Sequence, residues 1–214
     1  MTNAVIVDAV RTAGGRRNGR LKDWHPADLA AHVLKALVER NDLDPALVDD
    51  VVMGCVMQVG EQSLNIGRNA VLAAGWPESV PATTVDRQCG SSQQALHFAA
   101  QGVIAGAYDI AIAAGVEVMT RTPMGASVVK GEMGWPFPPS MQERYADTGL
   151  PPQGIGAEMI ADEYGFSRED LDAFGAESQR RAAQATAEGR FDNEIVPVPV
   201  VLDGETEMHT VDEG

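Results

Sequence analysis

The chain has 214 residues, 44% of them apolar, and a formal net charge of −15. This length fits one large or two modest domains, and the apolar fraction supports a folded core. The negative charge argues against a nucleic-acid-binding surface, which needs a basic patch, and it gives no overall attraction for an anionic ligand.

The first half of the chain predicts strands that alternate with helices. The apolar run over residues 4–10, broken only by Asp8, predicts a strand buried in a covered sheet. A loop rich in glycine and arginine follows, and Pro26 suits the first position of a helix that reaches about residue 40. The next expected elements are a short helical piece, a strand and a second helix, at 45–48, 51–58 and 64–74.

The loop before Pro26 is unusually basic. Five cationic residues fall within twelve positions, and they could in principle hold a phosphate: Arg11, Arg16, Arg17, Arg20 and Lys22. We interpret this loop as solvated in preference to a phosphate clamp.

The centre of the chain combines a strand, a turn and a helix around Cys89. Residues 82–85 predict an extended run, and the following helix stops near Gly106. Cys89 then lies at the helix N-terminus, where free amide groups and the helix dipole stabilise a thiolate, so it is a candidate nucleophile for acyl transfer. The alternative is that Cys89 packs as a small buried hydrophobe, as cysteines commonly do.

A further apolar strand over 109–114 completes this pattern. Strands alternating with helices indicate an α/β fold with a mostly parallel sheet covered by helices. We therefore expect residues 1–120 to form one α/β domain that carries the nucleophile.

Residues 121–214 differ in character and predict a separate loop or lid domain, incomplete in this chain. Seven prolines and glycines lie between Met133 and Pro152, among soft apolar and aromatic side chains that argue against disorder. Helices are expected over 155–164 and 167–188, the second opened by a capping box. A strand over 195–202 contains two prolines, which indicates a sheet edge.

The cysteines and histidines predict a protein of a reducing compartment that has no metal site. The two cysteines, the lack of a signal peptide and the lack of an 18-residue apolar run predict a soluble, cytoplasmic protein. Cys55 follows an apolar stretch and is expected to pack near the site, not to pair with Cys89. The four scattered histidines show no metal-ligand spacing.

Several sequence blocks carry a resemblance to a known family. Val80-Pro-Ala-Thr-Thr-Val-Asp-Arg-Gln-Cys-Gly-Ser-Ser-Gln-Gln-Ala95, followed by Gly115-Val-Glu-Val-Met-Thr-Arg-Thr-Pro123, resembles the nucleophilic-cysteine segment of the thiolases (acetyl-CoA acyltransferases). Further blocks agree in the same order, so the resemblance runs from about residue 4 to the C-terminus: 5–12, 54–58, 65–70, 178–183, 189–191 and 194–197.

The resemblance implies a layered α/β fold of two similar halves, of which this chain holds the first with its inserted loop domain. The family's Asn-Glu, Gly-His-Pro and second Cys-x-Gly catalytic loops belong to the second half, and none appears here. The implied reaction is condensation of acyl-CoA with acetyl-CoA, or thiolysis of a 3-ketoacyl-CoA, through an acyl-cysteine. No cofactor is implied, since the coenzyme A thioester is the substrate. A chain or segment carrying the second half is the expected partner, within a homo-oligomer, and this chain alone should not turn over.

The resemblance also assigns candidate site residues. Cys89 would be the nucleophile and its backbone N–H an oxyanion donor, with Gly90 and Ser91 in support. The loop domain would supply substrate contacts: Met124, Met133, Met141 and Gln153. The Gln153 region lacks the His-Met pair of the short-chain enzymes, which favours a bulkier acyl chain.

Two other functions compete with this reading. A non-catalytic thiolase-like subunit that binds acyl-CoA or stabilises a partner would also lack the second-half loops. A papain-like peptidase is disfavoured, because Ser92 and Gln93 stand where a cysteine and an aromatic residue are expected. A half-fold of either thiolase kind should expose apolar surface and therefore associate with itself or with a partner.

Overall fold

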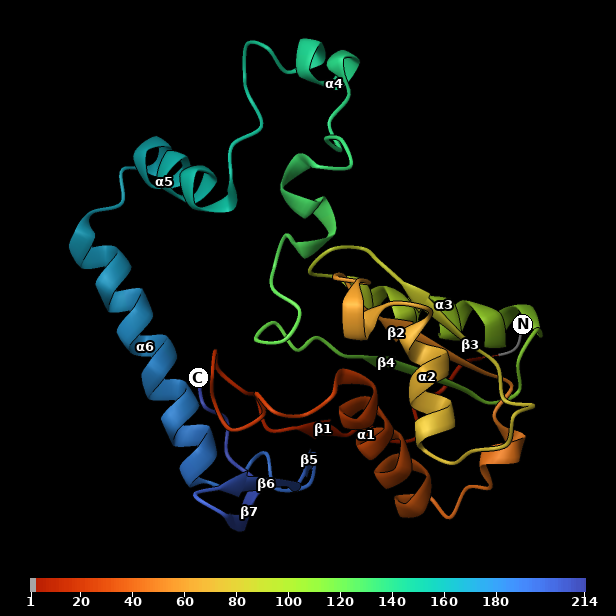
Figure 1. Cartoon of the computed structure of the whole chain (residues 1–214). Helices are drawn as coiled ribbons and strands as arrows, with labels where there is room; N and C mark the ends of the chain where they lie inside the picture. The colour runs from red at the N-terminus through yellow and green to blue at the C-terminus, as the bar shows by residue number, and fades with distance from the viewer. Residues whose placement is uncertain (1–2) are drawn as a thin grey trace. The chain divides into compact units, whose positions relative to one another are not determined.

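The computed structural model describes residues 3–214, with Lys130 described by its backbone alone. The chain forms two compact units (Figure 1). The first runs through Val129 and is rejoined by Asn193–Gly214, and Lys130–Asp192 form the second.

This division differs from the boundary expected near residue 120, and it assigns the C-terminal segment to the first unit. The reason is long-range pairing: β5 (Ile195–Val196) lies parallel to β1 (Arg11–Thr12). Met1 and Thr2, which open the predicted first domain, lie outside the described residues.

The first unit is built on a three-stranded parallel sheet. Its strands are β2 (Asp50–Gly54), β3 (Ala82–Val85) and β4 (Ala111–Gly115), in the order β3-β2-β4. The register pairs Gly54 of the central strand with the last residue of each neighbour, Val85 and Gly115. The three carboxyl ends therefore form one edge of the sheet, and the expected parallel α/β arrangement is confirmed.

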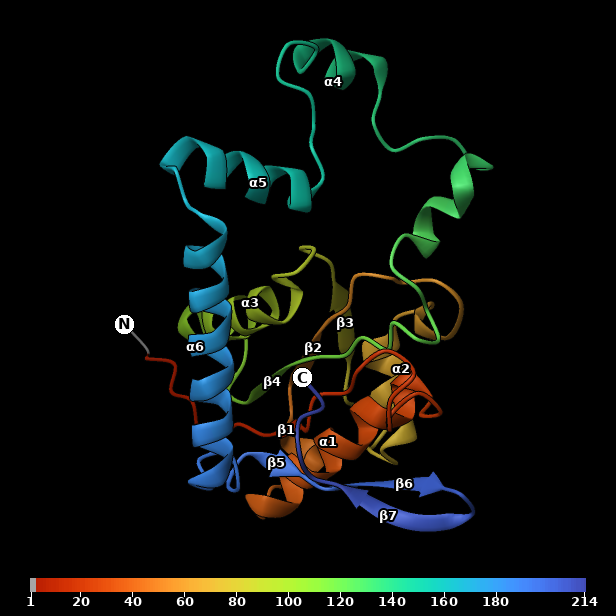
Figure 2. The same ribbon diagram turned by 90° about the vertical axis from the view of Figure 1, so that its left-hand side faces the viewer.

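Helices cover both faces of this sheet. The helices α1 (Pro26–Arg40) and α2 (Ile66–Ala73) pack on the face that presents Val51 and Met53, and α3 (Ser91–Ala105) packs on the face of Gly54 (Figure 2). Side chains of successive β2 residues point to opposite faces of the sheet. Val51 and Met53 therefore face α1 and α2, and Gly54 faces α3.

Local signals set the ends of these helices as expected. The His25 side chain accepts a hydrogen bond from the Ala27 amide at the start of α1, and Pro26 occupies the first turn. Gly106 ends α3 with φ +76°, a left-handed conformation that glycine adopts without strain. Two short 3-10 helices, η1 (Pro45–Leu47) and η2 (Gly60–Gln62), lie in the connections.

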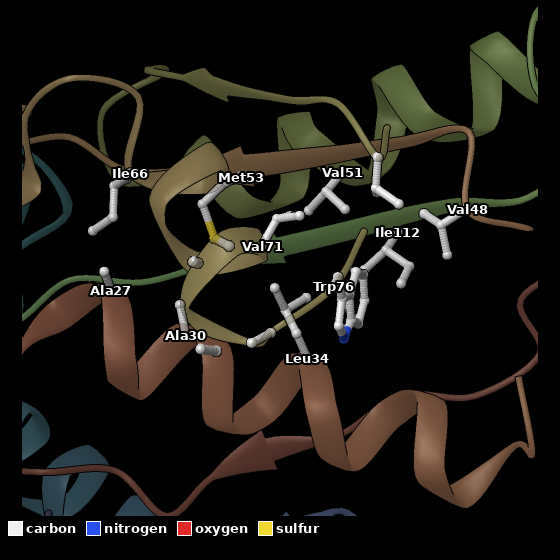
Figure 3. Close-up of a cluster of buried hydrophobic side chains, with 14 of the residues drawn as sticks. Ala27, Ala30, Leu34, Val48, Val51, Met53, Ile66, Val71, Trp76 and Ile112 are labelled. Carbon is white, nitrogen blue, oxygen red and sulfur yellow. The ribbon is translucent and has the colours of Figure 1, made fainter. Parts of the chain in front are cut away.

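The main core lies between the sheet and the α1–α2 layer. Figure 3 shows Leu34 of α1 facing Trp76 and Val71, with Met53 and Ile66 nearby. All five are buried, and Leu34 is 1% exposed. This contiguous cluster fixes the sheet on α1 and α2.

A second, smaller core joins α1 to the C-terminal hairpin. The hairpin consists of β6 (Val198–Leu202) and β7 (Glu205–His209), which pair antiparallel. Val198 and Val200 pack with Leu21, Leu29 and Val118. The strand expected over 195–202 is thus divided between β5 and β6, with Pro197 at the break.

The predicted buried strand over residues 4–10 is wrong. Residues 3–10 have no strand assignment, and Val5, Ile6 and Val7 are 78%, 73% and 81% exposed. A strand needs a neighbour for its backbone hydrogen bonds, and β1 alone, two residues long, obtains one.

The second unit consists of helices without a core of its own. It contains α4 (Pro139–Arg144), α5 (Gln153–Tyr164) and α6 (Arg168–Ala187), and the capping box of Ser167 and Asp170 at the start of α6 is confirmed. Among its described side chains only Ala161 is buried, while large apolar groups such as Phe174, at 81%, are exposed. These helices must therefore bury their apolar side chains against another surface to be stable.

Candidate active site

Cys89 lies in a tight turn at the carboxyl edge of the sheet. The turn connects β3 to α3, and Gly90 is the N-cap residue of α3. Gln88 adopts φ +47°, which is uncommon for a residue with a side chain. The Cys89 side chain is exposed, which excludes the buried-hydrophobe alternative for this residue.

The Ser91 hydroxyl holds this turn in shape. Its Oγ accepts a hydrogen bond from the Arg87 amide at 2.9 Å and donates to the Gln88 carbonyl at 2.6 Å. The amides of Gly90 and Ser91 also bond back to the carbonyls of Arg87 and Gln88. Ser91 is 5% exposed, so this buried network fixes the backbone on both sides of Cys89.

Two glycines allow the first turn of α3 to rest on the strand ends. A Cβ at Gly54 would lie 2.5 Å from the Ser91 carbonyl carbon and 2.7 Å from Ser92 Cα. A Cβ at Gly115 would lie 2.5 Å from Ser92 Cβ. Any side chain at either strand position would displace the helix start, and with it the turn that carries Cys89.

Glu117 ties together the loops that follow β2 and β4. Its carboxylate accepts hydrogen bonds from the amides of Val56 and Met57, at 2.8 and 3.2 Å, and from Gln62 Nε2 at 2.6 Å. The fully buried Gln62 accepts one from the Val118 amide at 2.8 Å. The sequence alone did not identify Glu117 or Gln62 as residues of the site. Glu117 carried a signal, because it is the single acid in the apolar run that follows the strand expected over 109–114.

The two cysteines lie in opposite environments. Cys55 is 1% exposed, and its amide bonds to the Val85 carbonyl at the end of β3. Burial raises the pKa of the Cys55 thiol to about 12, and the nearby carboxylates of Glu117 and Asp86 add to the shift. Cys55 is therefore an inert packing residue at neutral pH, whereas the exposed Cys89 is accessible to reagents and substrates.

The predicted substrate-binding residues fall in both units. Met124 lines a cavity of about 560 Å3 in the first unit, together with Arg16, Arg17 and Lys22 of the basic loop. Met133, Met141 and Gln153 belong to the second unit, where Met133 and Gln153 are exposed. Their role in substrate binding stays a prediction.

Most of the basic loop is paired with acidic residues near the C-terminus. Arg11 bonds to Glu194 and Asp212, each at 2.7 Å. Arg20 bonds to Glu207 at 2.6 Å, and Arg16 lies 3.7 Å from Glu213. These contacts attach the C-terminal segment to the loop, and they neutralise charges that a phosphate clamp would need.

Within residues 3–214 no group of three histidine, cysteine or carboxylate side chains is arranged to hold a metal ion. In the same part of the chain, no helix combines the length and the hydrophobicity needed to cross a membrane.

Comparison with known proteins decides the family. The family model "Thiolase, N-terminal domain" matches residues 4–214. The chain belongs to the thiolase family. Its arrangement is also that of a solved thiolase: the crystal structure of the Bacillus anthracis acetyl-CoA acetyltransferase superposes with a TM-score of 0.80 at 30% identity, covering all of this chain and 55% of the other.

Two relatives illustrate the match in sequence. The steroid 3-ketoacyl-CoA thiolase FadA6 of Mycobacterium tuberculosis is 44% identical over 219 residues, covering 100% of this chain and 53% of the relative. The 3-ketoacyl-CoA thiolase of Aliivibrio salmonicida is 45% identical over 201 residues, covering 92% and 50%. The chain spans about half the length of these curated relatives. It corresponds to the N-terminal domain of the thiolases.

Proposed function

We propose that this chain supplies the nucleophile of a thiolase-type acyltransferase that acts on acyl-CoA or 3-ketoacyl-CoA. The observation that carries the proposal is the exposed Cys89 thiol at the start of α3, in a turn braced by Ser91. The Cys89 thiolate attacks the acyl carbonyl carbon and forms an acyl-cysteine. From an acyl-CoA the C–S bond breaks and the CoA thiolate leaves. From a 3-ketoacyl-CoA the bond between C2 and C3 breaks, and acetyl-CoA leaves as a carbanion that takes up a proton.

The oxyanion that develops during this attack needs a hydrogen-bond donor. We assign the Cys89 amide to this role, because the neighbouring amides of Gly90 and Ser91 already bond to the carbonyls of Arg87 and Gln88. Such a donor contributes about 3 kcal/mol to transition-state stabilisation in acyl-transfer enzymes. The rigid turn keeps the donor in place before the substrate arrives.

The remaining groups are proposed to come from outside this chain. The exposed His97 lies on α3 itself, two turns beyond Cys89, and His209 is buried against the Ala13 carbonyl. Neither is arranged as a base for Cys89. We therefore expect the general base and the second cysteine in the half that the relatives possess beyond the match, and no turnover by this chain alone.

Selective alkylation tests the first part of the proposal. Iodoacetamide near pH 7 should modify Cys89 rapidly and leave Cys55 unmodified, as read from peptide masses. Cys55→Ser should keep the fast reaction, and Cys89→Ser should abolish it. Equal modification of both cysteines would contradict the assignment.

Activity tests the second part. The chain co-expressed with the second half of a thiolase relative should cleave a 3-ketoacyl-CoA in the presence of CoA, and Cys89→Ser should remove this activity. A complex that forms and leaves Cys89 without an acyl adduct in intact-mass spectra would favour the alternative, a non-catalytic acyl-CoA-binding or structural subunit.

A further inference from the structure

The peptide group between Gln88 and Cys89 is held by two donors that both belong to Ser91. The Gln88 carbonyl accepts a hydrogen bond from the Ser91 hydroxyl at 2.6 Å and another from the Ser91 amide at 3.1 Å. Ser91 is buried, so water competes little for the hydroxyl bond. This peptide group therefore has a fixed orientation.

The direction of the Gln88 carbonyl determines the direction of the Cys89 amide. A trans peptide group is planar, and its C=O and N–H bonds point in opposite directions. Because the carbonyl is turned toward Ser91, in the first turn of α3, the Cys89 N–H points away from that turn. This N–H is the group to which the mechanism above assigns the oxyanion.

The backbone of Gln88 does not favour this orientation by itself. Gln88 adopts φ +47°, in the left-handed region that residues with a side chain rarely occupy. Such a conformation persists where surrounding contacts hold it. The Asp86 carboxylate accepts a hydrogen bond from the Gln88 amide at 2.7 Å, and the Ser91 hydroxyl holds the carbonyl of the same residue. Asp86 is exposed to water, so the buried Ser91 bond is the better protected of the two.

We propose that Ser91 is a positioning residue for acyl transfer, whose hydroxyl aims the Cys89 amide at the developing oxyanion. This inference rests on the proposed function, because it concerns the same intermediate. A hydrogen bond weakens steeply as its angle falls toward about 120°, so a peptide group that turns loses much of its value as a donor.

The size of the effect follows from what a substitution would leave in place. Removing an oxyanion donor outright costs about 100- to 1000-fold in rate in other acyl-transfer enzymes. In Ser91→Ala the Cys89 amide remains, and the Gln88 carbonyl keeps its bond to the amide of position 91. We therefore expect a smaller loss, of about tenfold.

Two reactions of the same thiol separate positioning from ordinary support of the fold. In acylation by acetyl-CoA, the acetyl group passes from the CoA sulfur to the Cys89 sulfur, and an oxyanion develops on the way. In alkylation by iodoacetamide, the thiolate displaces iodide from a saturated carbon, and no oxyanion develops. Both reactions need the Cys89 thiolate, so the ratio of their rate constants reports the oxyanion donor.

The test uses this chain co-expressed with the second half of a thiolase relative and purified as a complex. Intact-mass spectra at successive times give the rate of acetylation by acetyl-CoA and, in parallel, of alkylation. Ser91→Ala should lower the acetylation rate constant at saturation about tenfold and leave the half-saturating acetyl-CoA concentration within about twofold. Alkylation should change by less than about twofold, since it uses no oxyanion donor.

Ser92→Ala is the matched control. Ser92 is the next residue of α3, it is exposed, and its hydroxyl takes no part in the bonds to Arg87 and Gln88. This variant removes the same chemical group from the same helical turn, and it should leave both rate constants unchanged.

Each other outcome overturns the inference. Unchanged acetylation in Ser91→Ala means that the hydroxyl does not aim the donor. An equal fall in acetylation and alkylation, or a Ser91→Ala chain that no longer forms the complex, assigns Ser91 a structural role only. An equal loss in Ser92→Ala means that the effect belongs to the helix start in general. If the complex without any substitution forms no acetyl-cysteine, the proposed function fails first and this inference falls with it.

Discussion

The contact between Gly54 and the start of α3 leads to a prediction for Gly54→Ala. The added Cβ would lie 2.5 Å from the Ser91 carbonyl carbon and 2.7 Å from Ser92 Cα. Two non-bonded carbon atoms in van der Waals contact are about 3.5–4.0 Å apart. Backbone atoms cannot rotate away as a side chain can, so the first turn of α3 must move by about 1 Å.

Overpacking of this kind costs about 1–3 kcal/mol, and the lower chain entropy of alanine in the unfolded state offsets about 0.4–1 kcal/mol of it. The net loss is about 1–2 kcal/mol, or a fall in Tm of roughly 2–8 °C for a domain of this size. The same movement disturbs the Ser91 hydrogen bonds, so the alkylation rate of Cys89 should change as well.

Thermal unfolding followed by circular dichroism, together with iodoacetamide kinetics at Cys89, measures both effects. Gly156→Ala is the control, because a Cβ there has open space within 4 Å and the residue lies inside α5. It should leave Tm unchanged or raise it. If Gly54→Ala keeps both the Tm and the alkylation rate of the unmodified chain, α3 does not rest on Gly54 as described.

Three further outcomes follow from the structure. Leu34→Ala should cost about 2–5 kcal/mol in urea unfolding, against less than about 0.5 kcal/mol for the exposed Leu72→Ala. Glu117→Ala should cost about 2–4 kcal/mol, because two amides and a buried amide side chain lose their acceptor, and it should make Cys55 easier to alkylate; an unchanged Tm would contradict this. A hydrogen bond from Arg11 holds the pKa of Asp212 below its ordinary value of 3.8. That carboxylate therefore stabilises the fold above about pH 4, and the stabilisation is lost as the pH falls through its native pKa. In Asp212→Asn the free energy of unfolding should depend less on pH in this acidic range. The difference should be under about 1 kcal/mol, because the ion pair is partly exposed.

The amino-acid sequence alone determined the elements whose signals are local. Pro26, Gly106 and the Ser167–Asp170 capping box act through contacts within a few residues of themselves, so the positions of α1, α3 and α6 could be predicted closely. The strand, turn and helix around Cys89 were predictable for the same reason, since each follows from its own short segment.

Only the tertiary structure decided the features that depend on partners distant in the chain. Residues 4–10 carry the pattern of a buried strand, yet they remain exposed because a strand forms only against a neighbour. The support of Cys89 by Gly54 and Gly115, and the bridging of two loops by Glu117, arise where separate strands end at one edge. The pairing of Arg11 with Asp212 likewise joins opposite ends of the chain, and no local pattern encodes which distant carboxylate a given arginine will meet.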